Sequence, residues 1–537
     1  MLKKRIWDAP IGVWLLSIIF GLLYYAIRSF YIDQDELRDA ISALRFFDRS
    51  DEWFFHGWHP LGMAPLALLY KLFSIPLGGM EPLDAMRMIA AVCFTLTLLL
   101  LYKWMSQWGL SRGNVVLLLF FMGANATLCA ATMGGQFMVN GLLVVIFWGA
   151  VGKLFRQKEP NASSLGLIAG LMTGLHMLMI VPAIVIGRLL AGRQAAGMGS
   201  YWASLLGLTL LIYGGSFALF AGGPQGKPGF VDWILATEAN ESPTMSPLSI
   251  AAPITMLERS INAILPLGPD MLRSQDIFQY HASGNLNKLL KGMFLIVVWV
   301  PLVMLFAIRG REQQRLSRGW PPTFKALGIS FLLLLPLVIV WQGATLGLFY
   351  WLILHLTLLA GIWLAQFTEE NQAQFGMGLA PLSIVLILFS LQKGATLTDK
   401  KWDPERDLVI AMKGDSRPND IIVSNLKPAF WSLYYNPTAE LYMPHREEDP
   451  LAMIERLMEK ARAEKRRIIV WDHSLNGSVL RAAGYPTIAA WQEKAEEAIT
   501  KWQENMPMLW RNSDMFYLTP TRNHWPIQVT KHDFSDE

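Results

Sequence analysis

Hydrophobic residues in this chain are gathered into long runs that are separated by shorter polar segments. A helix of about 20 apolar residues spans the hydrocarbon core of a bilayer, so runs near this length predict transmembrane helices. Such runs lie at residues 9–28, 85–104, 114–133, 136–155, 164–191, 200–221, 291–308, 326–342, 346–366 and 377–392. The pattern therefore predicts a polytopic α-helical membrane protein.

We expect the run at residues 164–191 to cross the membrane twice. Three residues that disfavour one continuous helix interrupt it: Gly174, His176 and Pro182. Lys and Arg in short loops favour the cytoplasm, and the basic loops at 153–158 and 309–318 share a side only if this run forms two shorter helices. We therefore predict about 11 membrane helices, a cytoplasmic N-terminus and an extracytoplasmic C-terminus.

The polar segments predict two parts of the chain. Residues 1–393 form the transmembrane domain, with external loops at 29–84 and 222–290, and residues 394–537 have the composition of a small soluble extracytoplasmic domain. Within this tail, strand-like segments at 407–415, 420–426 and 466–474 surround an amphipathic helix at 449–467. This mixture predicts an appended C-terminal α/β domain.

The first external loop contains a short helix with acidic residues at its start. Apolar residues recur at helical spacing, at Leu37, Ile41, Leu44 and Phe47, with polar positions Arg38, Asp39, Ser42 and Arg45 between them. This pattern predicts a helix lying in the membrane interface. Asp33, Asp35 and Glu36 then lie where the first span leaves the membrane. They are candidate site residues, although carboxylates at a helix start also serve as caps.

Composition excludes several function classes. The chain is 53% hydrophobic and only 16% charged, with a net charge of +4, whereas about 25% of residues are charged in soluble domains. This excludes a disordered chain, a module that binds nucleic acid through basic stripes, and an ordinary soluble enzyme. Cys93 and Cys129 both lie in apolar runs, which excludes a disulfide framework and a CxxC metal site.

Residues 5–200 resemble a known family in the order of their elements. The segments DELRDAISALRF, HPLGMAPLALLYKLFS and LDAMRMIAAVCF follow the first span in this order. They resemble the polyprenyl-phosphate-sugar-dependent glycosyltransferases of the GT-C class, in the branch of the protein O-mannosyltransferases and aminoarabinose transferases. The family pattern corresponds here to Asp35-Glu36, His59-Pro60-Leu61 and Arg87-Met88. This chain departs from it at Gly62, where the family has a second proline, and at about Gln136, where several members have a carboxylate.

The resemblance implies a hexosyl- or pentosyltransferase of the cell envelope in the plasma (inner) membrane. Its donor is a sugar on a polyprenyl phosphate, and its acceptor is an extracytoplasmic glycan, lipid or protein. An inverting transfer needs one carboxylate to take the proton of the acceptor hydroxyl, and the resemblance nominates Asp35 as this base, with Glu36 beside it. Retention by double displacement would need a second catalytic carboxylate close by.

Further residues are candidates for substrate binding. The leaving phosphate needs cations or backbone donors, and the second external loop supplies Arg259, Arg273, His281 and Lys288, each of which also fits an ordinary interfacial role. The other candidates are Asp33, His56, His59 and Gln136. No cofactor is predicted, although a divalent metal held by the loop histidines and acids stays an alternative. For His176 and His355, within apolar runs, we favour hydrogen bonds between helices over a functional role.

A catalytically silent scaffold or lipid-binding assembly protein of the same fold is the alternative to an enzyme, because of the departures at Gly62 and Gln136. A transporter is disfavoured, since transporters carry charges near the membrane midplane and paired broken helices in similar halves. The middles of the runs here are nearly uncharged, and the two halves are unlike. The expected partners are therefore the lipid-linked donor, its acceptor and membrane lipid, with no nucleic acid.

Overall fold

The structure is a computed structural model of the whole chain. It describes residues 9–30, 34–45, 55–62, 64–74, 81–129, 135–155, 161–192, 197–222, 227–235, 321–340, 346–397, 419–423, 426–442, 450–464, 468–471, 515–520 and 527–531, and the single residues Met293, Val297, Trp299, Val300, Val303 and Arg466.

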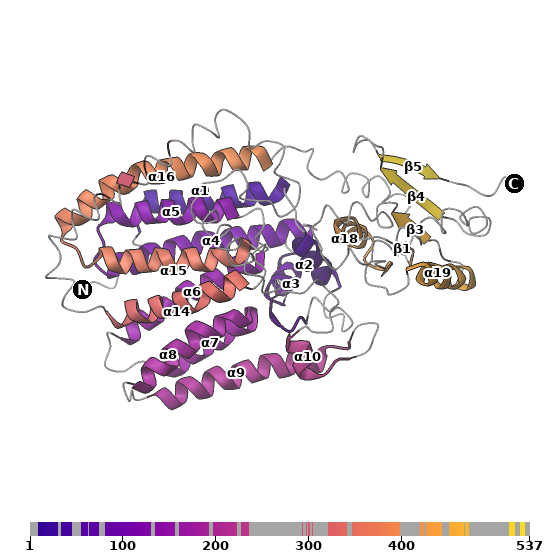
Figure 1. Cartoon of the computed structure of the whole chain (residues 1–537), viewed down its shortest axis with the longest axis horizontal. Coiled ribbons are helices and arrows are strands. Elements are labelled where there is room, and N and C mark those ends of the chain that lie inside the picture. Colours follow the sequence, from indigo (N-terminus) through magenta and orange to yellow (C-terminus); the bar gives the residue numbers. More distant parts are fainter. Residues whose placement is uncertain are drawn as a thin grey trace.

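Long apolar helices form most of the described structure, and in Figure 1 they lie side by side. They are α1 (Ile11–Phe30), α4 (Pro82–Gln107), α5 (Arg112–Cys129), α6 (Gly135–Leu154), α7 (Ala162–Leu175), α8 (Ile180–Gly192), α9 (Met198–Leu219), α14 (Pro322–Val340), α15 (Leu346–Leu364) and α16 (Glu369–Leu397). Three shorter helices are α2 (Gln34–Leu44), α3 (Ala64–Ser74) and α10 (Phe230–Leu235). The long helices coincide with the predicted runs, except that the run at 291–308 lies outside the described residues apart from single positions.

Four described helices are long and apolar enough to cross a membrane by length and composition. They are Pro82–Gln107, Phe137–Leu154, Met198–Leu219 and Glu369–Leu388, and six shorter apolar helices accompany them. The structure is thus mostly helical, as predicted. The count of about 11 spans stays a prediction.

The run at 164–191 forms two helices rather than one, with the 3₁₀ turn Met177–Met179 between α7 and α8. Gly166 and Gly174 of α7 lie against Tyr201 and Ile212 of α9, respectively, so α7 and α9 run in the same direction. Helix α8 brings the chain back between them, since it ends close in sequence to the start of α9. The two helices are therefore a hairpin whose tip contains His176.

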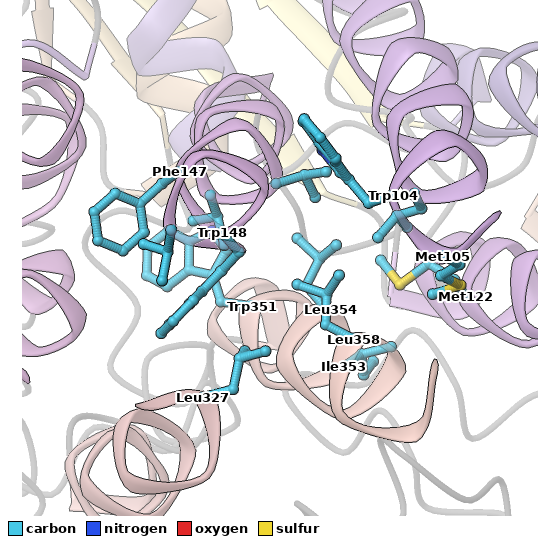
Figure 2. Close-up of a cluster of buried hydrophobic side chains, with 14 of the residues drawn as sticks. Trp104, Met105, Met122, Phe147, Trp148, Leu327, Trp351, Ile353, Leu354 and Leu358 are labelled. Atoms are coloured by element: carbon cyan, nitrogen blue, oxygen red, sulfur yellow. The ribbon is translucent and has the colours of Figure 1, made fainter. Parts of the chain in front are cut away.

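The core between the helices is apolar and rich in aromatic side chains. Figure 2 shows one part of it, with Trp104, Met105, Met122, Phe147, Trp148, Leu327, Trp351, Ile353, Leu354 and Leu358 contributed by α4, α5, α6, α14 and α15. The indole of Trp148 donates a hydrogen bond of 3.2 Å to Nε2 of His355, which joins α6 to α15. This confirms the helix-to-helix bond expected for His355.

The C-terminal part contains a mixed five-stranded sheet. Its strands are β1 (Ile421–Val423), β2 (Glu440–Tyr442), β3 (Ile468–Trp471), β4 (Met515–Pro520) and β5 (Ile527–Lys531), and its helices are α18 (Leu426–Tyr435) and α19 (Pro450–Glu464). The order is β2-β1-β3-β4-β5, parallel except for β5, which is antiparallel to β4.

Three of these elements lie within segments that the sequence predicted to form strands or a helix. Strands β1 and β3 fall within the strand-like segments at 420–426 and 466–474, and α19 lies within the amphipathic segment at 449–467. The segment at 407–415 lies outside the described residues. The domain boundary at 394 and the side of the membrane stay predictions.

Candidate functional site

Helix α2 carries the predicted catalytic acids in its first turn. It begins at Gln34, shortly after α1 ends, so the backbones of Asp35 and Glu36 lie where the chain leaves the first apolar helix. Their side chains, and Asp33 as a whole, lie outside the described residues. The structure therefore fixes the helix that bears Asp35 and Glu36, and their roles stay proposals.

The predicted position of α2 in the membrane interface stays a prediction, but protein covers more of this helix than its apolar positions alone indicate. Its apolar residues Leu37 and Ile41 are 0% and 4% exposed, but the predicted polar position Ser42 is also only 1% exposed. The reason is that α18 of the C-terminal part packs on α2 (Figure 1). The same buried cluster joins α2 to α4, α9 and α18. Helix α2 is therefore enclosed by protein on more than one side.

The segment at 55–62 docks on the tip of the α7–α8 hairpin through two backbone hydrogen bonds. The amide of Met177 donates to the carbonyl of Trp58 at 2.8 Å, and the amide of Leu61 donates to the carbonyl of Gly174 at 2.9 Å. The close approach of these two segments brings the loop that carries His56 and His59 onto the end of the helix bundle.

Three histidines meet at this contact. The rings of His56 and His59 stack with centroids 4.4 Å apart, and the ring of His176 lies 6.3 Å from that of His59. Nδ1 of His176 accepts a hydrogen bond from the amide of Leu178, which caps the 3₁₀ turn of the hairpin. The hydrogen bond between helices favoured for His176 is thus replaced by a local cap, because the residue lies at a break between helices and not within one.

Loss of contact with water keeps the ring of the half-buried His59 uncharged. Burial lowers the pKa of His59 to about 4, although a hydrogen bond with its own backbone acts in the opposite direction. Its Nδ1 is buried and has no hydrogen-bond partner among the described residues. At neutral pH this side chain is therefore a neutral donor or acceptor of hydrogen bonds and supplies no positive charge to a phosphate.

Helix α10 makes a hydrogen bond to the segment at 55–62. Nε1 of Trp233 in α10 donates a hydrogen bond of 2.7 Å to the carbonyl of Phe55, and the Trp233 side chain is only 5% exposed. No local sequence pattern indicates this contact, because an isolated tryptophan in a loop is also typical of an aromatic residue at the membrane interface.

Arg87, at the position that matches the family's Arg-Leu pair, is buried near the start of α4. Its guanidinium donates to Asp84 at 3.3 Å, one turn earlier, and its side chain is 3% exposed against 45% for that of Asp84. Leu83 and Met86 on the same turns belong to the buried cluster that contains α2. A buried cation therefore lies at the same end of the bundle as α2.

The remaining predicted site residues are not brought together by described structure. Arg259, Arg273, His281 and Lys288 lie outside the described residues, and Gln136 is placed by its backbone alone, in the first turn of α6. Within the described part of the chain, no group of three or more His, Cys, Asp or Glu residues is arranged to hold a metal ion. This leaves the metal alternative untested, since the side chains of the acids in the first loop are not among these residues.

Comparison with known proteins identifies the fold. No protein-family description matches the chain, and no curated protein matches its sequence. Its structure, however, is similar in fold to two solved structures, as the resemblance to the GT-C class implied. These are crystal structures of ArnT from Cupriavidus metallidurans, one bound to undecaprenyl phosphate and one in the apo state.

The likeness extends over most of both chains. For each of the two structures the TM-score is 0.53, the sequence identity is 12%, and the match covers 84% of this chain and 88% of that chain. The recognition of a GT-C-class fold from the first half of the sequence is thus confirmed. At this identity the comparison establishes the fold alone, and the activity has to be argued from the site.

Proposed function

We propose that this protein is a membrane glycosyltransferase that moves a sugar from a polyprenyl-phosphate-linked donor to an extracytoplasmic acceptor. The observation that carries the proposal is the fold shared over 84% of the chain with ArnT, one structure of which is bound to undecaprenyl phosphate. The acceptor is a glycan, a lipid or a protein. The protein belongs in the plasma (inner) membrane, with its N-terminus in the cytoplasm and residues 394–537 outside.

Asp35 acts as the base of an inverting transfer. Its carboxylate takes the proton of the acceptor hydroxyl as that oxygen forms a bond to the anomeric carbon, and the bond from this carbon to the phosphate oxygen breaks. The polyprenyl phosphate leaves with the electron pair. To Glu36, the next residue of the same helix, we assign the orientation of an Arg or Lys side chain.

The enclosure of α2 supports this role. A base works only when its carboxylate is held within hydrogen-bond reach of the proton it removes. Ala40 and Ala43, on later turns of α2, are 0% exposed, so the backbone that carries Asp35 is fixed by packing. Rigid placement of a catalytic group in the absence of substrate reduces the ordering that must occur in the transition state.

The leaving phosphate also needs cations that stabilise its charge. Arg273 and its neighbours in the second external loop are the first candidates, and Arg87 adds a buried guanidinium at the start of α4. His59, which stays neutral, contributes a hydrogen bond and no charge. Fixed donors of this kind stabilise the charge that develops as the bond to phosphate breaks.

Transfer by purified protein tests the proposal. Wild-type protein in nanodiscs is given a labelled polyprenyl-phosphate sugar and a panel of envelope acceptors, and we expect Asp35→Asn to abolish transfer without changing the size-exclusion profile. The matched control is Glu370→Gln, an exposed acid at the start of α16, for which we expect wild-type turnover.

Two results would contradict an enzymatic role. Binding of polyprenyl phosphate without transfer to any acceptor would favour the silent scaffold, for which Gln136 in place of an acid is the supporting feature. Near-normal turnover of Asp35→Asn would remove Asp35 from the mechanism.

A further inference from the structure

We propose that the C-terminal α/β part is a positioning element for the site: it braces α2, the helix that carries Asp35, through Arg45 and Tyr434. This inference rests on the proposed function, because it assigns a role to contacts around the proposed base. It concerns described residues that lie more than 300 positions apart in sequence.

Arg45, directly after α2, ties this helix to the turn between α18 and β2. Its Nε donates to the carbonyl of Pro437 at 3.2 Å, and its Nη2 donates to the carbonyl of Ala439 at 3.5 Å. The turn is itself held, since the amide of Ala439 donates to Asn436 and the amide of Glu440 donates to the carbonyl of Asp420. The end of α2 is thereby connected to the first two strands of the sheet.

Tyr434 provides a second attachment, from α18 to the membrane helices. Its hydroxyl donates a hydrogen bond of 3.2 Å to Oε2 of Glu81, the residue that precedes the first turn of α4. Burial raises the pKa of Tyr434, and the nearby carboxylate of Glu81 raises it further. The hydroxyl therefore keeps its proton at physiological pH and remains a donor to that carboxylate.

Apolar packing fills the space between these two attachments. Trp431 of α18 is 0% exposed and belongs to the same cluster as Leu37 and Ile41 of α2 and Met86 of α4. Helix α18 therefore contacts the helix that carries the proposed base and, through Tyr434, the start of a long membrane helix. It sets the position of one relative to the other.

Helix α2 depends on such support because it is short. It has 11 residues, and isolated helices shorter than about 12–15 residues are marginal in water. Asp35 lies ten residues before Arg45, which is about 15 Å along a helix. A tilt of about 4° around the Arg45 end would therefore move the backbone of Asp35 by about 1 Å, and a misplacement of this size can cost about 100-fold in rate.

The brace has a kinetic signature that general destabilisation lacks. Loosening it misplaces the base relative to the acceptor oxygen, while the polyprenyl phosphate binds through other groups. We expect Arg45→Ala in the full-length protein to lower kcat by about 10- to 100-fold, with KM for the donor unchanged within about twofold. Arg45→Lys keeps a charged nitrogen that can donate to one of these carbonyls, so this variant should recover part of the lost kcat. Tyr434→Phe removes the hydroxyl that donates to Glu81, and we expect it to lower kcat as well.

The matched control is Arg456→Ala. Arg456 is an exposed arginine of the same C-terminal part, and its Nε bonds to the carbonyl of Ala452 within its own helix α19. We expect it to leave kcat and KM at wild-type values. Hydrogen–deuterium exchange of the peptide that covers α2 gives a readout independent of activity, and this exchange should become faster in Arg45→Ala and not in Arg456→Ala.

The outcomes separate this inference from the proposed function. Unchanged kcat in Arg45→Ala, or unchanged exchange of α2, would overturn the brace even if the wild type is active. A rise in KM for the donor in Arg45→Ala, together with loss of its size-exclusion peak, would also overturn the brace. Such a result would indicate that Arg45 is needed for folding in general. A wild-type protein that transfers no sugar would overturn the proposed function alone, and the exchange of α2 would then decide whether the C-terminal part holds this helix.

Discussion

Replacing Gly57 by alanine tests how closely the segment at 55–62 must approach helix α10. A Cβ at this position would contact the backbone of α10 directly, at the carbonyl oxygen of Trp233, with the carbonyl carbon of Trp233 at 2.7 Å and Cα of Ile234 at 2.8 Å. Ordinary van der Waals contacts begin near 3.4 Å. The two segments would thus have to separate by about 0.7 Å or more. The nearest atoms all belong to the backbone of α10, so a change of side-chain rotamer cannot relieve the contact.

The cost follows from what this separation breaks. Overpacking costs about 1–3 kcal/mol, and stretching the bond from Trp233 to the buried carbonyl of Phe55 adds about 1–3 kcal/mol, the penalty for an unsatisfied buried group. We therefore expect a destabilisation of about 2–6 kcal/mol. His56 and His59, on the same loop, should lose their stacked arrangement.

Thermal unfolding in detergent, followed by tryptophan fluorescence, measures this effect against Gly207→Ala as control. Gly207 lies in α9 with nothing within 4 Å of the position of a Cβ, so its substitution should not lower the midpoint, and the higher helix propensity of alanine should raise it slightly. A Gly57→Ala protein as stable as the control, with wild-type exchange in residues 55–62, would refute the close contact between the two segments.

Three further expectations concern other parts of the molecule. Arg273→Ala should weaken binding of a labelled polyprenyl phosphate while Arg309→Ala, on the predicted cytoplasmic side, should not; equal affinities would mean that the wrong cation has been chosen. A reporter fused after residue 395 should report an extracytoplasmic location, and a cytoplasmic signal would contradict the predicted topology. Burial alone would raise the pKa of Glu440, but hydrogen bonds from Lys460, Arg466 and Tyr442 lower it to about 2 from 4.5. The stability it contributes is therefore present above pH 4.5 and lost as the pH falls toward 2, and this loss, followed by hydrogen exchange of β2, should be absent in Glu440→Gln.

The sequence alone determined the membrane class and the positions of most long helices. This follows because a helix that crosses lipid must satisfy its own backbone and present apolar side chains, so the length of a hydrophobic run is enough to locate it. The break at Gly174 and Pro182 likewise predicted two helices in place of one, and α7 and α8 have this arrangement. The order of elements in the first half predicted the GT-C-class fold that the comparison with ArnT confirms.

Only the tertiary structure decided what covers α2. Its periodicity indicated a helix with one apolar face. That pattern does not show whether the opposite, polar face contacts water or another helix. Ser42 is buried, and Arg45 bonds to carbonyls about 390 residues away. The contact of Trp233 with Phe55 spans 178 residues. Such pairs are set by the packing of distant elements against each other, and a local pattern of polar and apolar residues contains no information about which distant segment will complete the surface.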